Sequence, residues 1–269
     1  MSELNEYEVY AIKYARHERT ARSNFMDPPD IHDGEMPIDY FIWLIRLNKQ
    51  NILVDTGFNA EAASKRGRQL IRCPAEGLRL MNTDPEDIKD VIITHLHYDH
   101  VGNFDLFPNA HFHLQDKEMI FATGRNMLHK PFRAPFDVNH IKGMVEQVFA
   151  EKVVFHNGSA ILQPGLELHH IGGHTAGLQC VRVMTKRGWV VLASDASHLY
   201  ANFERKNPYP IIFREDEMLE GFETLKSLAA STNHIVPGHD PLVIERYPSP
   251  SPNLMGIVAR LDEQEPDHG

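Results

Sequence analysis

The chain has 269 residues, of which 42% are apolar, and it carries a formal net charge of −10. An acidic chain without a dense run of Lys or Arg does not favour general nucleic-acid binding, because phosphate recognition requires a basic surface. The only two cysteines, Cys73 and Cys180, lie far apart, so we expect no disulfide framework and a cytoplasmic protein. We also expect no secretory signal and no membrane span, because the sequence has no cationic leader and no apolar run of roughly 18 residues.

Alternating and apolar segments predict strands in both halves of the chain. Residues 7–14 alternate between polar and apolar side chains, as a half-buried strand does. Two apolar runs, 38–47 and 52–55, are separated by the polar turn 48–51 and predict an antiparallel hairpin. Further strands are predicted at residues 90–93, 110–114, 152–156, 160–162, 166–171, 178–184, 188–194 and 234–236.

Helical segments are predicted between these strands. Residues 60–82 form a predicted helix that breaks near Cys73-Pro74, and a short helix follows at 84–87, where proline occupies the first turn. Residues 115–150 are predicted to be mostly helical, and residues 215–230 place their apolar side chains on one helix face. Strands flanked by helices in both halves predict an α+β fold of two packed sheets with helices outside.

Two loop-like segments and the tail have more than one interpretation. The apolar side chains within 15–36 either pin that loop to the core or form a rim for a substrate. The interruption at 129–138 is either a lid or pocket wall, or a plain connection between helices. The candidate pocket residues are Phe25 and Met26 in the first segment and Arg133 and Phe136 in the second. The tail from residue 248 is Pro/Ser-rich and then acidic, which suggests poor order.

The densest chemistry lies in one loop after a predicted strand. Three histidines and one aspartate, His95, His97, Asp99 and His100, fall within six positions directly after the apolar run 90–93. In extended geometry His95, His97 and Asp99 point the same way, whereas His100 requires a turn. Taken alone, side chains this close bind a metal, pair their charges or remain in water.

Three more candidate ligands follow predicted strands elsewhere. His174 lies in a glycine-flanked loop, Asp195 follows an apolar strand directly, and His239 follows a Pro-Gly turn. Five imidazoles and two carboxylates suit zinc or a similar first-row ion better than calcium or magnesium, which prefer oxygen ligands. Seven ligands exceed the needs of one tetrahedral zinc, so the set predicts two metal ions that share one carboxylate.

Other polar residues near these strand ends have two interpretations. Asp55, at the end of a predicted strand, is either structural or accepts an N–H from a ligand histidine. His169 and His170 precede His174 on one strand, and they either occupy ordinary strand positions or contribute one side chain to the pocket.

The order His-x-His-x-Asp-His, Gly-His, strand-end Asp and Gly-His resembles the metallo-β-lactamase superfamily over about residues 38–245. Within it the chain is similar to the quorum-quenching N-acyl homoserine lactonase group. The segments that carry this resemblance are Ile52–Gly57, His95–Asn103, Gly173–Gly177, Asp195–Ser197 and Gly238–Asp240. The resemblance implies one domain over residues 1–269, an αββα sandwich of two mixed sheets, with a first strand and substrate-side loop in 1–37 and a C-terminal tail in 248–269.

The resemblance also assigns the metal ligands. It implies one zinc ion held by His95, His97 and His174, a second held by Asp99, His100 and His239, and Asp195 as the bridge between them. Iron, cobalt or manganese are alternatives to zinc. Lactonases of this group carry a tyrosine three residues after the bridging aspartate, where this chain has His198, followed by Tyr200. Whether His198 or Tyr200 replaces that tyrosine is left open.

The resemblance implies a dinuclear zinc hydrolase that opens a lactone ring by attack of metal-bound hydroxide. The substrate that the resemblance favours is an N-acyl homoserine lactone. Asp99, His198 and Tyr200 are the candidate catalytic residues, with Asp99 placed to move a proton to the leaving oxygen. The alternative is a related hydrolase of another small lactone, ester, cyclic amide or thioester, as in glyoxalase II. A redox di-iron or non-catalytic metal-binding protein is a third interpretation. We expect no nucleic-acid or membrane partner and leave a homodimer open.

Overall fold

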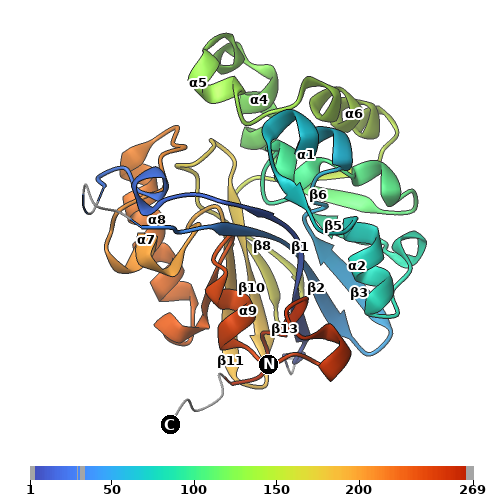
Figure 1. Cartoon of the computed structure of the whole chain (residues 1–269). Coiled ribbons are helices and arrows are strands. Elements are labelled where there is room, and N and C mark those ends of the chain that lie inside the picture. The colour runs from blue at the N-terminus through green and yellow to red at the C-terminus, as the bar shows by residue number, and fades with distance from the viewer. Residues whose placement is uncertain (1–3, 29, 31–33, 265–269) are drawn as a thin grey trace.

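The computed structural model describes residues 4–28, 30 and 34–264, and its larger sheet crosses the middle of the molecule (Figure 1). In spatial order this sheet contains β13 (Val258–Arg260), β1 (Glu8–His17), β2 (Ile38–Leu47), β3 (Gln50–Val54), β5 (Asp90–Ile92), β6 (His111–Gln115) and β7 (Val153–His156). The short strand β4 (Gln69–Leu70) also pairs with β1. The sheet is mixed, because β13 to β3 pair antiparallel and β3 to β7 pair parallel.

A smaller mixed sheet packs against the first. In spatial order it contains β12 (Ile235–Pro237), β11 (Gly188–Ser194), β10 (Gln179–Thr185), β9 (Leu166–His170) and β8 (Ala160–Gln163). Only β12 runs parallel to its neighbour in this sheet. The parallel β11–β12 pair matters for function, because its two carboxyl ends lie at the same edge.

Apolar side chains fill the space between the sheets and the space under the helices. On β1, Val9 and Ala11 belong to the core that the two sheets share, whereas Tyr10 and Ile12 belong to the core beneath the helices of the larger sheet. Side chains alternate across a strand, so a central strand must be apolar on both faces. This explains why β2 is buried from its first residue through Ile45 and is apolar at every one of these positions except Asp39.

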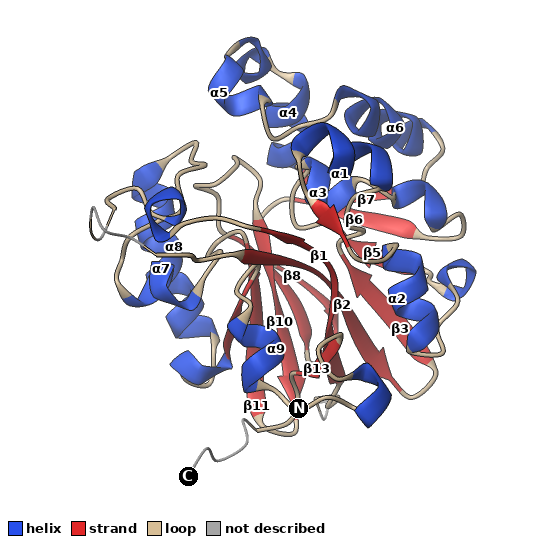
Figure 2. Cartoon of the chain, viewed as in Figure 1, coloured by secondary structure: helices blue, strands red, loops and turns tan. Residues whose placement is uncertain are grey.

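Helices cover the outer faces of both sheets (Figure 2). They are α1 (Ala60–Arg66), α2 (Pro74–Leu80), α3 (Tyr98–Val101), α4 (Asp116–Thr123), α5 (Lys130–Arg133), α6 (Val138–Phe149), α7 (Tyr200–Glu204), α8 (Glu215–Leu228) and α9 (Leu242–Arg246). Helices α4 to α6 gather at one end of the molecule, and α8 covers the smaller sheet. The prediction of two mixed sheets with outer helices is confirmed. Within the described ranges, no helix has both the length and the apolar character that a membrane span demands.

Two segments differ from the sequence-based expectation. Helix α1 ends earlier than predicted, at Gly67, which adopts a left-handed conformation with φ 63°, and β4 then pairs with β1 before α2 begins. The tail forms β13, and the buried residue Leu261 donates its N–H to the Val9 carbonyl oxygen at 2.7 Å. The expectation of a poorly ordered tail is therefore wrong for residues 248–264. The rest of the tail, residues 265–269, lies outside the described part, as do residues 1–3, 29 and 31–33 near the N-terminus.

Candidate metal centre

Four strands from the two sheets end at one edge and position the predicted ligands. The ligands come from the loops after β5 (His95, His97, Asp99 and His100), β9 (His174), β11 (Asp195) and β12 (His239). The turns are tight: Ser194 has a left-handed φ of 48°, and a Cβ on Gly238 would lie 2.7 Å from the Ser194 carbonyl oxygen. Only glycine allows the loop after β12 to approach the loop after β11 this closely.

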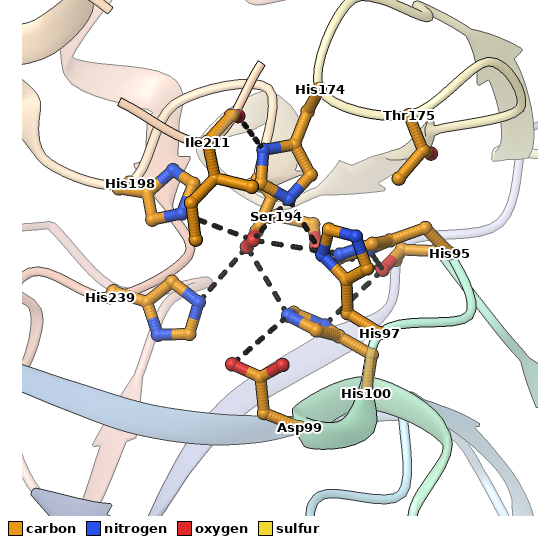
Figure 3. A network of polar contacts seen from close by, with 12 residues as sticks. His95, His97, Asp99, His100, His174, Thr175, Ser194, His198, Ile211 and His239 are labelled. Carbon is orange, nitrogen blue, oxygen red and sulfur yellow. Dashed lines mark hydrogen bonds and ion pairs between the residues drawn. The ribbon is translucent and has the colours of Figure 1, made fainter. Parts of the chain in front are cut away.

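Asp195 lies within 3.6 Å of a ring nitrogen of four of the candidate ligand histidines. Figure 3 shows how these histidines point toward one another. Its Oδ2 atom is 3.0 Å from His174 Nε2 and 3.6 Å from His95 Nε2. Its Oδ1 atom is 2.9 Å from His239 Nε2 and 3.3 Å from His100 Nε2. The two carboxylate oxygens therefore face two different pairs of imidazoles.

The ligand atoms form two groups, each compact enough to hold one ion. The groups are His95, His97, His174 and Asp195, and Asp99, His100 and His239, with all ligand atoms of a group within 4.8 Å of one another. Asp195, His198 and His239 form a third group that overlaps these two. The structure thus brings together all seven residues that the sequence nominated as metal ligands, and the first two groups correspond to the two sets that the resemblance implied.

The electrostatics of the cluster fit divalent metal ions. Nε2 of His95 and of His100 is buried and makes no hydrogen bond within the described chain, although buried nitrogen atoms normally have a partner. Burial lowers the pKa of His95 and His97 well below the ordinary value and keeps both rings neutral, which is the form that binds metal. Burial would raise the pKa of Asp195, but the surrounding imidazoles hold it well below its usual range and keep the carboxylate charged.

The second ring nitrogen of several ligand histidines is held by an acceptor, as metal sites require. His174 Nδ1 is 2.7 Å from the Ile211 carbonyl oxygen, and His239 Nδ1 is 2.9 Å from the Asp39 carbonyl oxygen. His100 Nδ1 is 2.7 Å from Asp55 Oδ2. Of the two interpretations of Asp55, the structure favours the one in which its carboxylate faces a ring nitrogen of a ligand histidine.

A buried carboxylate that sequence reasoning missed joins two of the ligand loops. Glu118, on α4, accepts hydrogen bonds from the Leu96 N–H at 2.9 Å, the Thr175 hydroxyl at 2.6 Å and the Gly177 N–H at 3.0 Å. The first donor belongs to the loop after β5 and the other two to the loop after β9. No local pattern marked Glu118, because its partners are distant in sequence.

His198 and Tyr200 have different surroundings. His198 is buried, places Nε2 3.1 Å from Asp195 Oδ2, and stacks on Tyr209 with ring centroids 3.8 Å apart and an interplanar angle of 5°. Tyr200 belongs to the core between the sheets, with the Arg246 guanidinium 3.9 Å from its ring centroid. The structure therefore brings His198 to the cluster and leaves Tyr200 outside the two ligand groups.

The four predicted pocket residues also separate. Phe136 packs edge-on against His97, with ring centroids 4.6 Å apart, and Phe136 and Arg133 line a mainly apolar cavity of about 620 Å³ beside α6. Phe25 is buried in the N-terminal segment, and Met26 is 44% exposed. Neither Phe25 nor Met26 lines a described cavity at the cluster.

The histidine pair before His174 has supporting contacts only. His169 Nε2 is 2.9 Å from a Glu167 carboxylate oxygen on the same strand. His170 Nε2 is 2.8 Å from the Ala176 carbonyl oxygen and so braces the loop that carries His174. Neither ring belongs to a ligand group.

With this geometry established, comparison with known proteins identifies the family. Residues 37–239 match the metallo-beta-lactamase superfamily. The chain belongs to this superfamily. An N-acyl homoserine lactonase from a Bacillus species is 29% identical over 225 residues, which cover 77% of this chain and 84% of the relative.

Solved structures agree on the metallo-β-lactamase fold. The crystal structure of a quorum-quenching N-acyl homoserine lactone lactonase superposes with a TM-score of 0.72 at 24% identity, covering 89% of this chain and 94% of that chain. A dizinc quorum-quenching lactonase superposes with a TM-score of 0.69 at 18% identity, covering 89% of each chain. The predicted αββα sandwich is confirmed, and this member of the superfamily is a metal-dependent hydrolase with a His/Asp metal-binding cluster.

Proposed function

We propose that the protein is a dinuclear zinc hydrolase that opens lactone rings, with N-acyl homoserine lactones as the substrate class that its relatives favour. The observation that supports this proposal is Asp195, whose two oxygens face two separate groups of imidazoles. Such a carboxylate suits a bridge between two ions, and the imidazole-rich donor set suits zinc or another first-row ion. Iron, cobalt and manganese remain alternatives.

When bound, two divalent ions supply Lewis-acid activation of water and of the substrate carbonyl. The chain supplies orientation and proton transfer. Asp99 is the one ligand that is not fully buried, and we propose that it moves a proton to the leaving oxygen of the opened ring. We assign His198 the role of the tyrosine found in related lactonases, because its Nε2 lies beside Asp195 and its ring is fixed by Tyr209.

An apolar cavity near His97 supports a substrate with an acyl substituent. Phe136 contacts His97 on one side and lines the apolar cavity of about 620 Å³ on the other. Met127, Val138 and Ile141 contribute to that cavity, so an apolar substituent that passes Phe136 is removed from water. This arrangement supports Phe136 and Arg133 as substrate-pocket residues.

A hydrolysis panel with zinc-loaded protein tests the proposal. The panel contains N-acyl homoserine lactones of several chain lengths, simple γ-lactones, aryl esters, a cyclic imide and S-lactoylglutathione. We expect the lactones to have the highest kcat/KM. A higher value for the ester, imide or thioester would replace lactone opening with that alternative.

The variant Asp195→Ala tests the role of the metal centre. We expect loss of bound metal and of hydrolysis together, because the carboxylate of Asp195 faces histidines of both ligand groups. Asp216→Ala, on the surface of α8, is the matched control and keeps both. If metal-free Asp195→Ala hydrolysed lactones as fast as the parent, the proposed mechanism would be wrong.

A further inference from the structure

The cavity directly over the metal cluster contains a cation that the proposed chemistry does not use. Arg68 lines this cavity together with Asp99, His198, Tyr209 and His239. Arg68 lies just before β4, in a segment with no pattern that marked it in the sequence. Asp99 and His239 are assigned to the metal ions, which leaves the charge of Arg68 to be explained.

The hydrogen-bond partners of Arg68 are all neutral groups. Its Nε donates to the Tyr98 hydroxyl at 3.1 Å, and its Nη1 donates to the Arg66 carbonyl oxygen at 2.6 Å and lies 3.1 Å from His17 Nε2. Burial, followed by repulsion from Arg68 and Arg19, lowers the pKa of His17 to about 4, so this ring is neutral at pH 7 and accepts the hydrogen bond.

The guanidinium therefore retains both charge and donors. Within the described ranges, Arg68 forms no ion pair with a carboxylate, and its hydrogen bonds come from Nε and Nη1 alone. Asp99 attracts the guanidinium and helps to raise its pKa, but Asp99 is assigned to a metal ion. Holding Tyr98 in place requires only Nε, so the free Nη2 group points to a second purpose. Guanidinium groups bind carboxylates with strong, directional hydrogen bonds.

We infer that Arg68 binds a carboxylate of the substrate, so that the preferred lactone carries an acidic group next to its ring. The inference rests on the proposed lactone hydrolysis and narrows its substrate class. Acyl homoserine lactones are uncharged, and the inference therefore predicts that an acidic lactone is a better substrate than they are. Because Arg68 and the candidate metal ligands line the same cavity, the acidic group must lie close to the ester bond that is cleaved.

A matched pair of lactones tests this inference. The pair is 5-oxotetrahydrofuran-2-carboxylate and its carboxamide, which share a ring and differ in charge. We expect the zinc-loaded parent to prefer the carboxylate, and Arg68→Met to lower kcat/KM for the carboxylate by about 10- to 100-fold, mainly through KM, because a charged hydrogen bond is lost. The kcat/KM of Arg68→Met for the carboxamide should change less than about threefold, since the carboxamide makes no charged pair with Arg68. Arg68→Lys should retain part of the preference for the carboxylate over the carboxamide, because the lysine ammonium still supplies a positive charge.

Arg66→Met is the matched control for folding and local packing. The Arg66 guanidinium lies 3.9 Å from the Tyr98 ring centroid and donates to the carbonyl oxygens of Ala134 and Phe136, outside the cavity lined by Arg68. This variant should change kcat/KM for both lactones by the same factor. Equal losses on both lactones in Arg68→Met, or no preference in the parent, would overturn the inference while leaving lactone hydrolysis intact.

Measurement of ligand binding tests the role of Arg68 independently of the proposed lactone hydrolysis. If the zinc-loaded parent opens no lactone, the proposed function fails, and calorimetry with the same two compounds still decides the role of Arg68. The carboxylate site is supported if the parent binds the carboxylate more tightly than the carboxamide and Arg68→Met binds both equally. The circular dichroism spectrum of the variant must match that of the parent. Equal binding of both compounds refutes it.

Discussion

At the scale of single residues, the centre depends on the groups that orient its ligands. Asp55 adopts a left-handed φ of 60°, an uncommon conformation for a residue other than glycine. It is held there by the Thr94 N–H and hydroxyl, each 2.8 Å from one of its carboxylate oxygens, while Oδ2 faces His100. The backbone strain is thus offset by contacts that fix the ring of one ligand.

Asp55→Asn should weaken the metal site that contains His100. We expect a loss of about 10- to 100-fold in affinity for one of the two zinc ions, because an amide cannot accept from all three donors. Competition with a chromophoric chelator measures both affinities. Asp84→Asn, an exposed cap that accepts from the Glu86 N–H at 3.1 Å, is the control. Unchanged affinity for both ions in Asp55→Asn would show that this orientation is dispensable.

The sequence predicted the candidate ligands but not the residues around them, for a physical reason. Each candidate ligand lies in the loop or short helix that follows a strand, so local pattern and chemical type were sufficient to find it. Arg68, Glu118 and Tyr209 lie in segments without such a pattern and reach the centre only through tertiary folding. Glu118, for example, bonds residues 22 and 59 positions away along the chain.

At the scale of elements, α4 and the loop after β9 approach each other without room for a side chain. A Cβ on Gly177 would lie 2.2 Å from the Glu118 backbone nitrogen. The contact is with backbone, so no rotamer change relieves it. The close approach is what lets the Gly177 N–H donate to the Glu118 carboxylate.

Gly177→Ala should therefore displace the loop that carries His174. We expect the free energy of unfolding to fall by about 1–3 kcal/mol, as for other overpacked sites, and zinc content to fall with it. Urea denaturation and metal analysis measure these changes. Gly34→Ala, where an added Cβ meets nothing within 4 Å, should stay within about 0.5 kcal/mol of the parent. A Gly177→Ala protein as stable as the Gly34→Ala protein would contradict the tight contact.

Prediction of the elements succeeded where periodicity is strong and failed where pairing is distant. The long apolar runs of β2 and β11 were found because a central strand is buried on both faces. Strand β13 has three residues and pairs with β1 from the opposite end of the chain. A strand this short has no detectable period of its own, and its partner alone determines it.

At the scale of the whole molecule, the cluster joins the two sheets. His95 to His100 follow β5 of the larger sheet, whereas His174, Asp195 and His239 follow strands of the smaller one. An ion held by both sets therefore links the two layers. We propose that the described chain unfolds as a single domain when its ions are bound.

Removal of metal should lower thermal stability in one step. Free ion at a thousand times its Kd stabilises a native state by about 4 kcal/mol, which corresponds to a shift in Tm of about 10 °C for a chain of this size. Calorimetry with and without a chelator measures the shift and the number of transitions. An unchanged Tm would mean that the ions do not link the sheets, and two separate transitions would argue against a single domain.

The buried carboxylate of Glu118 has a consequence for protein engineering. Segment 116–149 holds α4 to α6 and borders the apolar cavity, so it is the natural part to exchange between relatives when substrate range is altered. An exchange that replaces Glu118 removes the acceptor for donors at Leu96, Thr175 and Gly177 at once. A chimera that brings a new specificity segment must therefore retain a glutamate at position 118, or it will lose its metal ions along with its old substrate.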